Sequence, residues 1–173
     1  MSVATVQSLL QATSWGDEID IGPYLTTLCA ELARSMIHDR RPVTLTVKAG
    51  PGTADSTRAV SLGLIVTELV INALKYAFAG NGTGHVIVEY AATAQDWRLS
   101  VSDDGQGLQS DGRAPSGGLG SRPIGALAAQ IGARIERTDL APGLAVTIIG
   151  EHRAMDADVA VPLDLIPAAA PPA

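Results

Sequence analysis

Side chains that could do chemistry together recur near the middle of the chain. Glu68, Asn72, Lys75 and Tyr76 follow one another at i, i+4, i+7 and i+8 within the segment ELVINALKYAF. Residues with these spacings share one face of a helix, so a carboxylate, a carboxamide, an ammonium and a phenol would point the same way. Such a set can hold a divalent cation and a polyphosphate, although an ordinary solvated helix face has the same pattern.

Two glycine-rich segments further along the chain carry complementary chemistry. The segment DDGQG, residues 103–107, follows a predicted strand. Asp103 at a strand end can accept hydrogen bonds from an exocyclic amine, and the glycines let the backbone approach a flat ligand. The alternative for this segment is a turn with an Asx cap. The segment GGLG, residues 117–120, leads into a predicted helix, where backbone amides can form an anion site, although many helices without such a site also start after glycines.

The elements that must position these residues can be predicted from periodicity. The helix that ends in ELVINALKYAF begins near Asp55 or Ser56, and its second face is apolar. That apolar face comprises Leu62, Ile65, Val66, Leu69, Val70, Ala73, Leu74 and Ala77. Two more helices are predicted, from Gly22 to about His38 and over Pro123–Gly132.

Alternation of apolar and polar residues predicts the strands, and glycine-containing turns separate several of them. The predicted strands are Val43–Ala49, His85–Ala91, Trp97–Ser102, Ala133–Thr138 and Ala145–Gly150. Helices combined with these strands predict an α/β (α+β) fold, a two-layer sandwich of helices on a mixed, mostly antiparallel sheet.

In this order, the three segments resemble the ATP-binding domain of sensor histidine kinases, in the superfamily that also holds DNA gyrase and MutL. ELVINALKYAF is similar to the N box, VSDDGQGL to the first glycine box and GGLGSRPIGALAAQIGA to the second. The phrase LGLIVTELVINALKYAF is closest to kinases with the variant dimerisation domain, near the HWE kinases. It lacks their WxE and has Tyr76 where they carry His. The resemblance covers roughly Ile19 to Gly150 and implies the Bergerat ATP-binding fold.

The resemblance implies roles for the residues of the N box. Asn72 would ligate the Mg²⁺ that bridges the ATP phosphates, and Glu68 would polarise the acceptor nucleophile or a water. Lys75 and Tyr76 would contact phosphate or ribose.

It also implies roles for the glycine boxes. Asp103 would accept a hydrogen bond from the adenine amino group, with Gly105 and Gly107 shaping the adenine wall. The lid that folds over the phosphates would contain Gly118, Leu119 and Gly120. The second box departs from the usual GLGLxLV at Ser121 and Pro123.

The implied activity is transfer of the γ-phosphoryl group of ATP to a histidine outside this chain segment, as the catalytic domain of a two-component kinase. The implied partners are an acceptor-His dimerisation domain and a response regulator. Residues 1–18 are expected to be a residual helix of that dimerisation hairpin, 19–150 the ATP-binding domain and 151–173 a flexible tail. Two alternatives remain open: a docking or phosphotransfer module that has lost nucleotide binding, and an anti-sigma-type Ser/Thr protein kinase.

The composition of the chain argues against several other classes of function. The net charge of −6 is spread along the chain without a Lys/Arg cluster, so nucleic-acid binding is not expected. No apolar run of about 18 residues and no signal pattern are evident, so a cytoplasmic location without membrane contact is expected. Cys29 is the single cysteine and shares a helical face with Leu25, Leu28 and Leu32, which predicts a core thiol. A monomer or weak dimer is expected.

None of the three histidines is expected to be the phosphoryl acceptor, although His38-Asp39 has the His-acid pairing of one. His38 precedes Asp39 but lies at the end of a helix predicted to belong to the ATP-binding domain. His85 begins a predicted strand, and His152 lies near the tail. The acceptor is therefore expected on another segment or chain.

Overall fold

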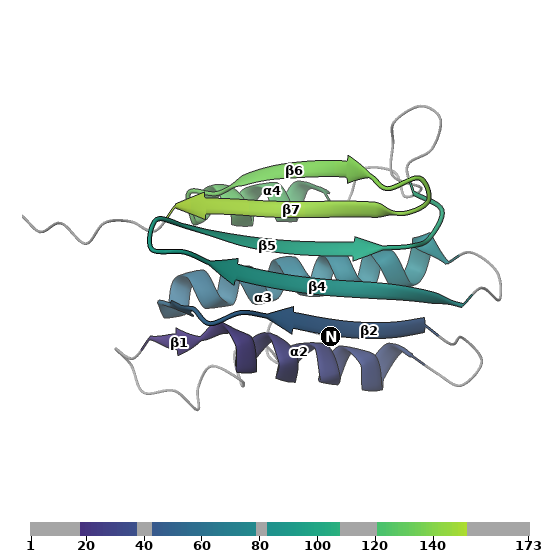
Figure 1. The fold of residues 1–173 in the computed structure, drawn as a ribbon, viewed down its shortest axis with the longest axis horizontal. Helices are drawn as coiled ribbons and strands as arrows, with labels where there is room; N and C mark the ends of the chain where they lie inside the picture. Colours follow the sequence, from purple (N-terminus) through teal and green to yellow (C-terminus); the bar gives the residue numbers. More distant parts are fainter. Residues whose placement is uncertain (1–17, 38–42, 79–82, 108–120, 152–173) are drawn as a thin grey trace, which may run out of the picture.

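A computed structural model describes residues 18–37, 43–78, 83–107 and 121–151. Within these ranges the chain forms a five-stranded sheet with helices packed against it, and a separate two-stranded pair (Figure 1). The predicted two-layer sandwich of helices on a mixed sheet is confirmed. The predicted N-terminal helix, the lid and the C-terminal tail lie outside the described residues, as do His38 and His152.

The five-stranded sheet has the order β2-β4-β5-β7-β6. Its strands are β2 Val43–Ala49, β4 Gly84–Ala92, β5 Asp96–Asp103, β6 Arg134–Asp139 and β7 Leu144–Glu151. Each predicted strand is present, with ends that differ by at most one residue. β2 and β4 pair in parallel, with Val43 opposite Gly84, and the other neighbours pair antiparallel. A parallel pair requires a crossover, and here a helix supplies it.

The helices are α2 Ile21–Met36, α3 Ser56–Asn72 and α4 Ser121–Gln130. An aspartate caps each of the first two: the Asp20 Oδ1 accepts from the Gly22 N–H at 3.2 Å, and the Asp55 Oδ1 accepts from the Arg58 N–H at 2.9 Å. In Figure 1, α3 and α4 lie behind the sheet and α2 runs along its β2 edge. Helix α3 contacts both α2 and α4, so it is the central helix of this layer.

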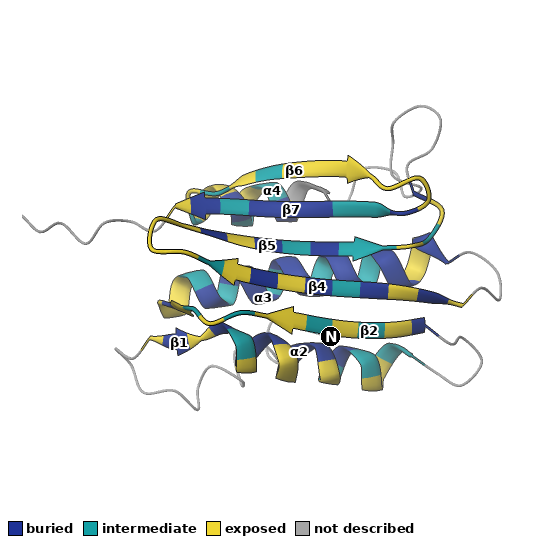
Figure 2. Cartoon of the chain, viewed as in Figure 1, coloured by how far each residue is buried: buried dark blue, intermediate teal, exposed yellow. Residues whose placement is uncertain are grey.

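The core is mainly aliphatic, and four of the six aromatic residues of the chain also belong to it: Tyr24, Phe78, Tyr90 and Trp97. Its fully buried members include Leu25, Leu28, Leu32, Leu62, Ile65, Val66, Val70, Val86, Val88, Leu99 and Ile148. Buried and exposed positions alternate along β4 and β5 (Figure 2), because successive side chains point to opposite faces of a sheet. The Cys29 side chain is only 2% exposed, which confirms the predicted core thiol.

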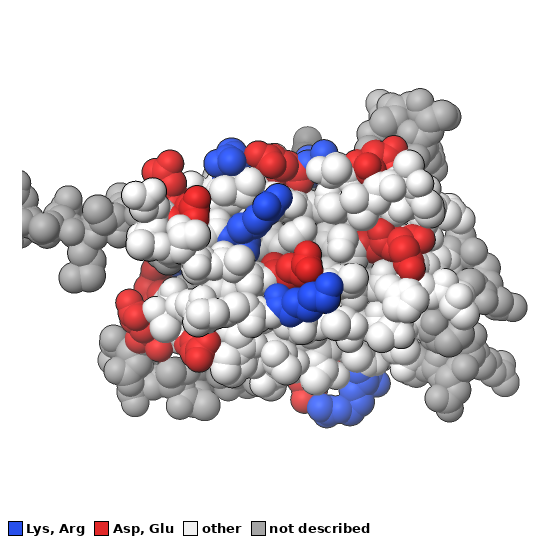
Figure 3. All heavy atoms as spheres, viewed as in Figure 1, with Lys and Arg blue, Asp and Glu red and all other residues white. Residues whose placement is uncertain are grey.

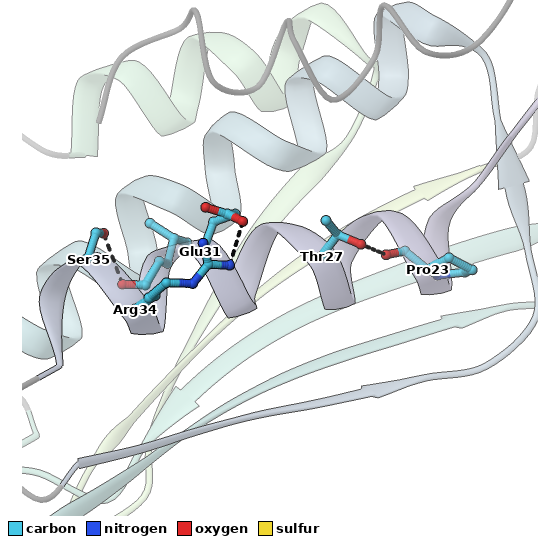
Figure 4. A network of polar contacts seen from close by, with 6 residues as sticks. Pro23, Thr27, Glu31, Arg34 and Ser35 are labelled. Carbon is cyan, nitrogen blue, oxygen red and sulfur yellow. Dashed lines mark hydrogen bonds and ion pairs between the residues drawn. The ribbon is translucent and has the colours of Figure 1, made fainter.

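Among the described residues, the outward face of α2 makes only local polar contacts (Figure 4). The Thr27 hydroxyl donates to the Pro23 carbonyl oxygen at 3.0 Å, and an Arg34 nitrogen lies 2.6 Å from a Glu31 carboxylate oxygen. Exposed ion pairs of this kind contribute about 0–1 kcal/mol. Burial of its apolar face is therefore what holds α2 in place.

The sheet face turned away from α3 and α4 carries charges of both signs among uncharged side chains (Figure 3). Lys48 on β2 and Glu89 on β4 pair across the parallel register at 3.4 Å. On β5 and β7, the hydroxyls of Ser100 and Thr147 lie 3.2 Å apart. This face is thus polar and locally paired.

Two features of the backbone differ from the sequence predictions. Residues 19 and 20, for which no strand was predicted, form β1 Ile19–Asp20, which pairs antiparallel with β3 Thr53–Ala54. The segment expected to continue the central helix instead becomes a π-helical turn, η1, over Ala73–Ala77. Two-residue strands have no periodicity to read, and a π turn leaves the apolar pattern of a helix largely intact.

One helical segment, Ser56–Ala77, is long and apolar enough to cross a membrane by length and composition. This qualifies the expectation from sequence that no apolar run of that length is present. More than half of the segment is buried inside the fold, between α2 and α4. A core helix passes the same test of length and composition.

Candidate functional site

The residues predicted to bind phosphate and metal lie at the end of the central helix. Glu68 and Asn72 belong to the last turns of α3 and are half-buried. They are four residues apart in regular α-helix, so their oxygens share one face. Lys75 and Tyr76 belong to the π turn η1 and are exposed, Tyr76 by 39%. Because a π turn has wider i→i+5 spacing, the predicted stripe does not continue with α-helical geometry to these two residues.

Asp103 ends strand β5 on the face that carries the helices. Its Oδ1 accepts from the Gly105 N–H at 3.0 Å, so the Asx turn that was the alternative for this segment is present. Burial raises the pKa of Asp103, the N–H groups of Gly105 and Leu144 lower it, and the neighbouring Asp104 raises it. A carboxylate can accept more hydrogen bonds than these two backbone groups donate, so Asp103 keeps acceptor capacity for a ligand.

Asp104 points the other way and joins two strands. Its Oδ1 accepts from the His85 N–H at 2.7 Å, and its Oδ2 lies 2.8 Å from the His85 Nδ1. These contacts, led by the His85 N–H, hold the pKa of Asp104 below its usual value. Adjacent carboxylates thus have different roles: Asp104 ties the start of β4 to the end of β5, and Asp103 faces the helix layer.

The loop after Asp103 rests directly on the end of the central helical segment. The Gln106 N–H donates to the Ala77 carbonyl oxygen at 3.0 Å. A Cβ added at Gly105 would overlap that oxygen and would lie 2.5 Å from the Ala77 Cβ. Only glycine permits this approach, and the contact brings the predicted adenine side of the site onto the helix end that bears Glu68 and Asn72.

The turn between β6 and β7 also packs against the loop of residues 103–107. Gly143 has φ +104°, and a Cβ added there would overlap the Asp103 carbonyl oxygen. A Cβ added at Gly107 would lie 3.0 Å from the Gly143 carbonyl oxygen. The sequence predicted a turn between the strands Ala133–Thr138 and Ala145–Gly150 but not its place beside residues 103–107, because nothing local signals a contact across about 40 residues.

The structure therefore brings together two of the three predicted segments. The N-box residues Glu68, Asn72, Lys75 and Tyr76 lie on one helical end, and Asp103, Gly105 and Gly107 lie on the loop seated against it. The third predicted segment, with Gly118, Leu119 and Gly120, lies outside the described residues. Ala77, Gly143 and Leu144 contact the loop of Asp103, a role that the sequence did not predict for any of them.

The donor set fits magnesium bound through a nucleotide. In the part of the chain that the structure describes, no group of three or more His, Cys, Asp or Glu side chains could hold a metal ion. Mg²⁺ usually keeps several waters and takes one or two protein oxygens together with substrate phosphates. The half-buried carboxamide of Asn72 and carboxylate of Glu68 supply hard oxygens of that kind.

Comparison with known proteins identifies the family. The model of the histidine kinase-, DNA gyrase B- and HSP90-like ATPases matches residues 57–150, just over half of the chain. A blue-light-activated histidine kinase 2 of Erythrobacter litoralis (strain HTCC2594) is 30% identical over 132 residues. That match covers 75% of this chain, and the chain spans 38% of that kinase's length.

Solved structures agree with this match. The histidine kinase domain from the Erythrobacter litoralis EL346 blue-light activated histidine kinase superposes with a TM-score of 0.74 at 26% identity, covering 85% of this chain and 76% of that one. Acinetobacter baumannii histidine kinase AdeS gives a TM-score of 0.61 at 17% identity, covering 86% and 73%; this likeness concerns the fold alone. The chain belongs to the histidine kinase-, DNA gyrase B- and HSP90-like ATPases, and it has the fold of a histidine kinase catalytic domain.

Proposed function

We propose that this chain binds ATP together with Mg²⁺ and transfers the γ-phosphoryl group to a histidine outside the segment. One observation carries the proposal: the loop that presents Asp103 is seated, through Ala77 and Gln106, on the helix end that presents Glu68 and Asn72. One continuous site thus contains the Asp103 carboxylate, which can accept from adenine, and the hard oxygens of Glu68 and Asn72, which suit a metal–phosphate complex. Family membership supports the same activity.

Each residue has a distinct task in this proposal. Asp103 accepts the hydrogen bond of the adenine amino group with the capacity left by the Gly105 and Leu144 N–H groups. Asn72 holds the metal ion, which when bound neutralises phosphate charge as the γ-phosphoryl group leaves. Glu68, one turn before Asn72, orients the acceptor nucleophile. Phosphoryl transfer demands chiefly such positioning and charge neutralisation.

The exposed residues of the π turn act at the rim of the site. Lys75 supplies a positive charge to phosphate oxygens, and Tyr76 contacts phosphate or ribose. Gly105 and Gly107 keep the adenine wall free of side chains. The lid over the phosphates would contain Gly118, Leu119 and Gly120.

The partners and location follow from the same assignment. The chain would work with an acceptor-His dimerisation domain and a response regulator, in the cytoplasm, and would be a monomer or weak dimer by itself. The match to a histidine kinase supports this proposal of partners, because the matched region is only 38% of that kinase and leaves room in it for further domains.

Calorimetric titration of ATP, with and without Mg²⁺, tests the nucleotide site. The wild-type chain should bind ATP more tightly with Mg²⁺, and Asn72→Ala should lose that enhancement. Gln95→Ala is the matched control, because Gln95 is an exposed residue of the β4–β5 hairpin, at the far end of β5 from Asp103. A wild-type chain that binds no ATP would refute the proposal and leave a docking module.

Incubation with radiolabelled ATP and a separate acceptor-His dimerisation domain tests the transfer. Acid-labile phosphate on that domain is the expected product, because phosphohistidine hydrolyses in acid. Acid-stable phosphate on a target protein would instead identify a Ser/Thr protein kinase.

A further inference from the structure

We propose that Ala77 is a positioning residue for the nucleotide. With Gly105 and Gln106 it forms a contact, called the latch below, that fixes the separation between the adenine acceptor Asp103 and the metal ligand Asn72. The inference rests on the proposed function, because it concerns how the adenine-binding and metal-binding parts of that one site are kept at a fixed separation.

The latch uses a carbonyl group that the end of the helical segment makes available. Ala77 is the last residue of the π turn η1, and Phe78 after it has left helical geometry, with φ −114° and ψ 59°. The last carbonyls of a helix have no partner within it and must find one elsewhere. The Ala77 carbonyl oxygen finds the Gln106 N–H at 3.0 Å, on the loop that follows Asp103.

The latch is also a tight steric contact. Ala77 is buried, with 8% of its surface exposed, and the space between it and Gly105 leaves no room for a Cβ on the latter. The parts that touch are a methyl group and backbone atoms, none of which has a rotamer to adjust. A shift of either partner must therefore move the other, as in any close-packed interior.

Short connections on both sides tie the latch to the proposed binding groups. The Gly105 N–H donates to the Asp103 carboxylate at 3.0 Å, so the residue seated on Ala77 also orients the adenine acceptor. On the other side, Ala77 follows Asn72 by five residues, all within the π turn. The latch is thus the direct link between the two halves of the site.

This placement predicts a selective effect on ligands that span both halves. ATP must reach Asp103 with its base and Asn72 with its metal-bound phosphates at the same time. Adenosine needs only the first half and tripolyphosphate with Mg²⁺ only the second. Two linked contacts strengthen binding only when the geometry lets the ligand make both at the same time. Disturbing the latch should therefore weaken the binding of ATP more than that of adenosine or tripolyphosphate.

Two variants disturb the latch in different ways, and each has a matched control. Gly105→Ala inserts a Cβ into the contact, and its control is Gly125→Ala on α4, where an added Cβ meets nothing within 4 Å. Gln106→Pro removes the N–H donor to Ala77, and its control Gln106→Ala keeps that donor. The Gln106 side chain is exposed, so neither change at this position removes buried surface.

Calorimetry with three probes tests the inference: ATP with Mg²⁺, adenosine, and tripolyphosphate with Mg²⁺. Both latch variants should lose about tenfold or more in ATP affinity, because linking two contacts strengthens binding by about 10²–10⁴-fold and that gain is lost when both cannot be made together. Tripolyphosphate affinity should change less than about threefold in both latch variants, and so should the adenosine affinity of Gln106→Pro. The Cβ of Gly105→Ala also enters the proposed adenine wall, so the adenosine affinity of that variant should fall too, though by less than its ATP affinity. The controls should match the wild type within about threefold, as substitutions away from a site usually do.

Equal losses for all three probes would overturn the inference, because they would indicate general damage to the fold. Unchanged ATP affinity in both variants would overturn it as well. If thermal melts show that Gly105→Ala does not fold, the affinities of Gln106→Pro for the three probes decide between these outcomes. A wild-type chain that binds no ATP would refute the proposed function instead, so the two failures are distinguishable.

Discussion

Replacing Asp103 with asparagine tests the proposed site and the folded state together. The carboxylate is half-buried at the end of β5 and already accepts from the Gly105 N–H at 3.0 Å. Asparagine keeps the shape but has one acceptor oxygen, which the backbone N–H occupies, and its amide group would face the adenine amine donor to donor. Loss of a hydrogen bond to a charged group costs about 1.5–3 kcal/mol, which is about 10–150-fold in ATP affinity.

The same substitution should stabilise the protein without ligand. Burial is the first cause that raises the pKa of Asp103, so the fold favours the neutral form. A group with a raised folded pKa contributes stability below its unfolded pKa and loses it as pH rises through the folded pKa. Asp103→Asn, neutral at every pH, should therefore be more stable than wild type at pH 7, and the difference should vanish at acid pH.

Asp104→Asn is the matched control. It lies one residue away, and its effect on stability at pH 7 should have the opposite sign. His85 holds the pKa of Asp104 low, so its charge contributes stability that is present above the unfolded pKa and is lost as pH falls through the folded pKa. This variant should be less stable at pH 7, by no more than about 1 kcal/mol because the pair is exposed. Its ATP affinity should stay within about threefold of wild type.

Urea unfolding at pH 7 and at acid pH, with ATP titration at pH 7, measures both quantities. Opposite shifts in the free energy of unfolding and a loss of affinity confined to Asp103→Asn are expected. If both variants lose stability and affinity alike, the distinction drawn between the two carboxylates is wrong.

Two further predictions concern stability and reactivity. Gly143→Ala should cost about 2 kcal/mol or more, because the new Cβ would overlap the Asp103 carbonyl oxygen at a positive φ. Gly132→Ala, also at positive φ but with nothing within 4 Å, should cost only about 1–2 kcal/mol in urea unfolding; equal losses would contradict the packing argument. Burial raises the pKa of Cys29 to about 12, so a thiol reagent at pH 8 should label it only as urea unfolds the protein. Rapid labelling of the native protein would show that α2 opens readily.

The elements with clear periodicity could be predicted from sequence. The alternation over Val43–Ala49 predicted both ends of β2, and the expected helix start near Asp55 or Ser56 agrees with α3. The π turn could not be predicted, because Ala73, Leu74 and Ala77 keep a helical pattern of buried positions. The β1–β3 pair was missed because two residues carry no alternation.

The site was only partly predictable for a related reason. Residue types and order predicted roles for Asn72 and Asp103, since carboxamide and carboxylate chemistry is a property of single residues. The contact of Gly105 with Ala77, the support from Gly143 and the burial of Asp103 depend on segments distant in sequence. Such contacts arise from tertiary packing, which single-sequence patterns do not encode.

The parallel pairing of β2 with β4 has a consequence for how the chain folds. Val43 pairs with Gly84, 41 positions further along, whereas β4 and β5 meet through a short hairpin. Closing a long loop costs more entropy than closing a hairpin, and contacts of large sequence separation slow folding. Residues 68–77 lie inside that long loop. The β5–β7 pair, with Asp103 opposite Leu144, also joins residues 41 positions apart. Both halves of the proposed site therefore depend on long-range strand pairings, and neither half can be completed by a local hairpin.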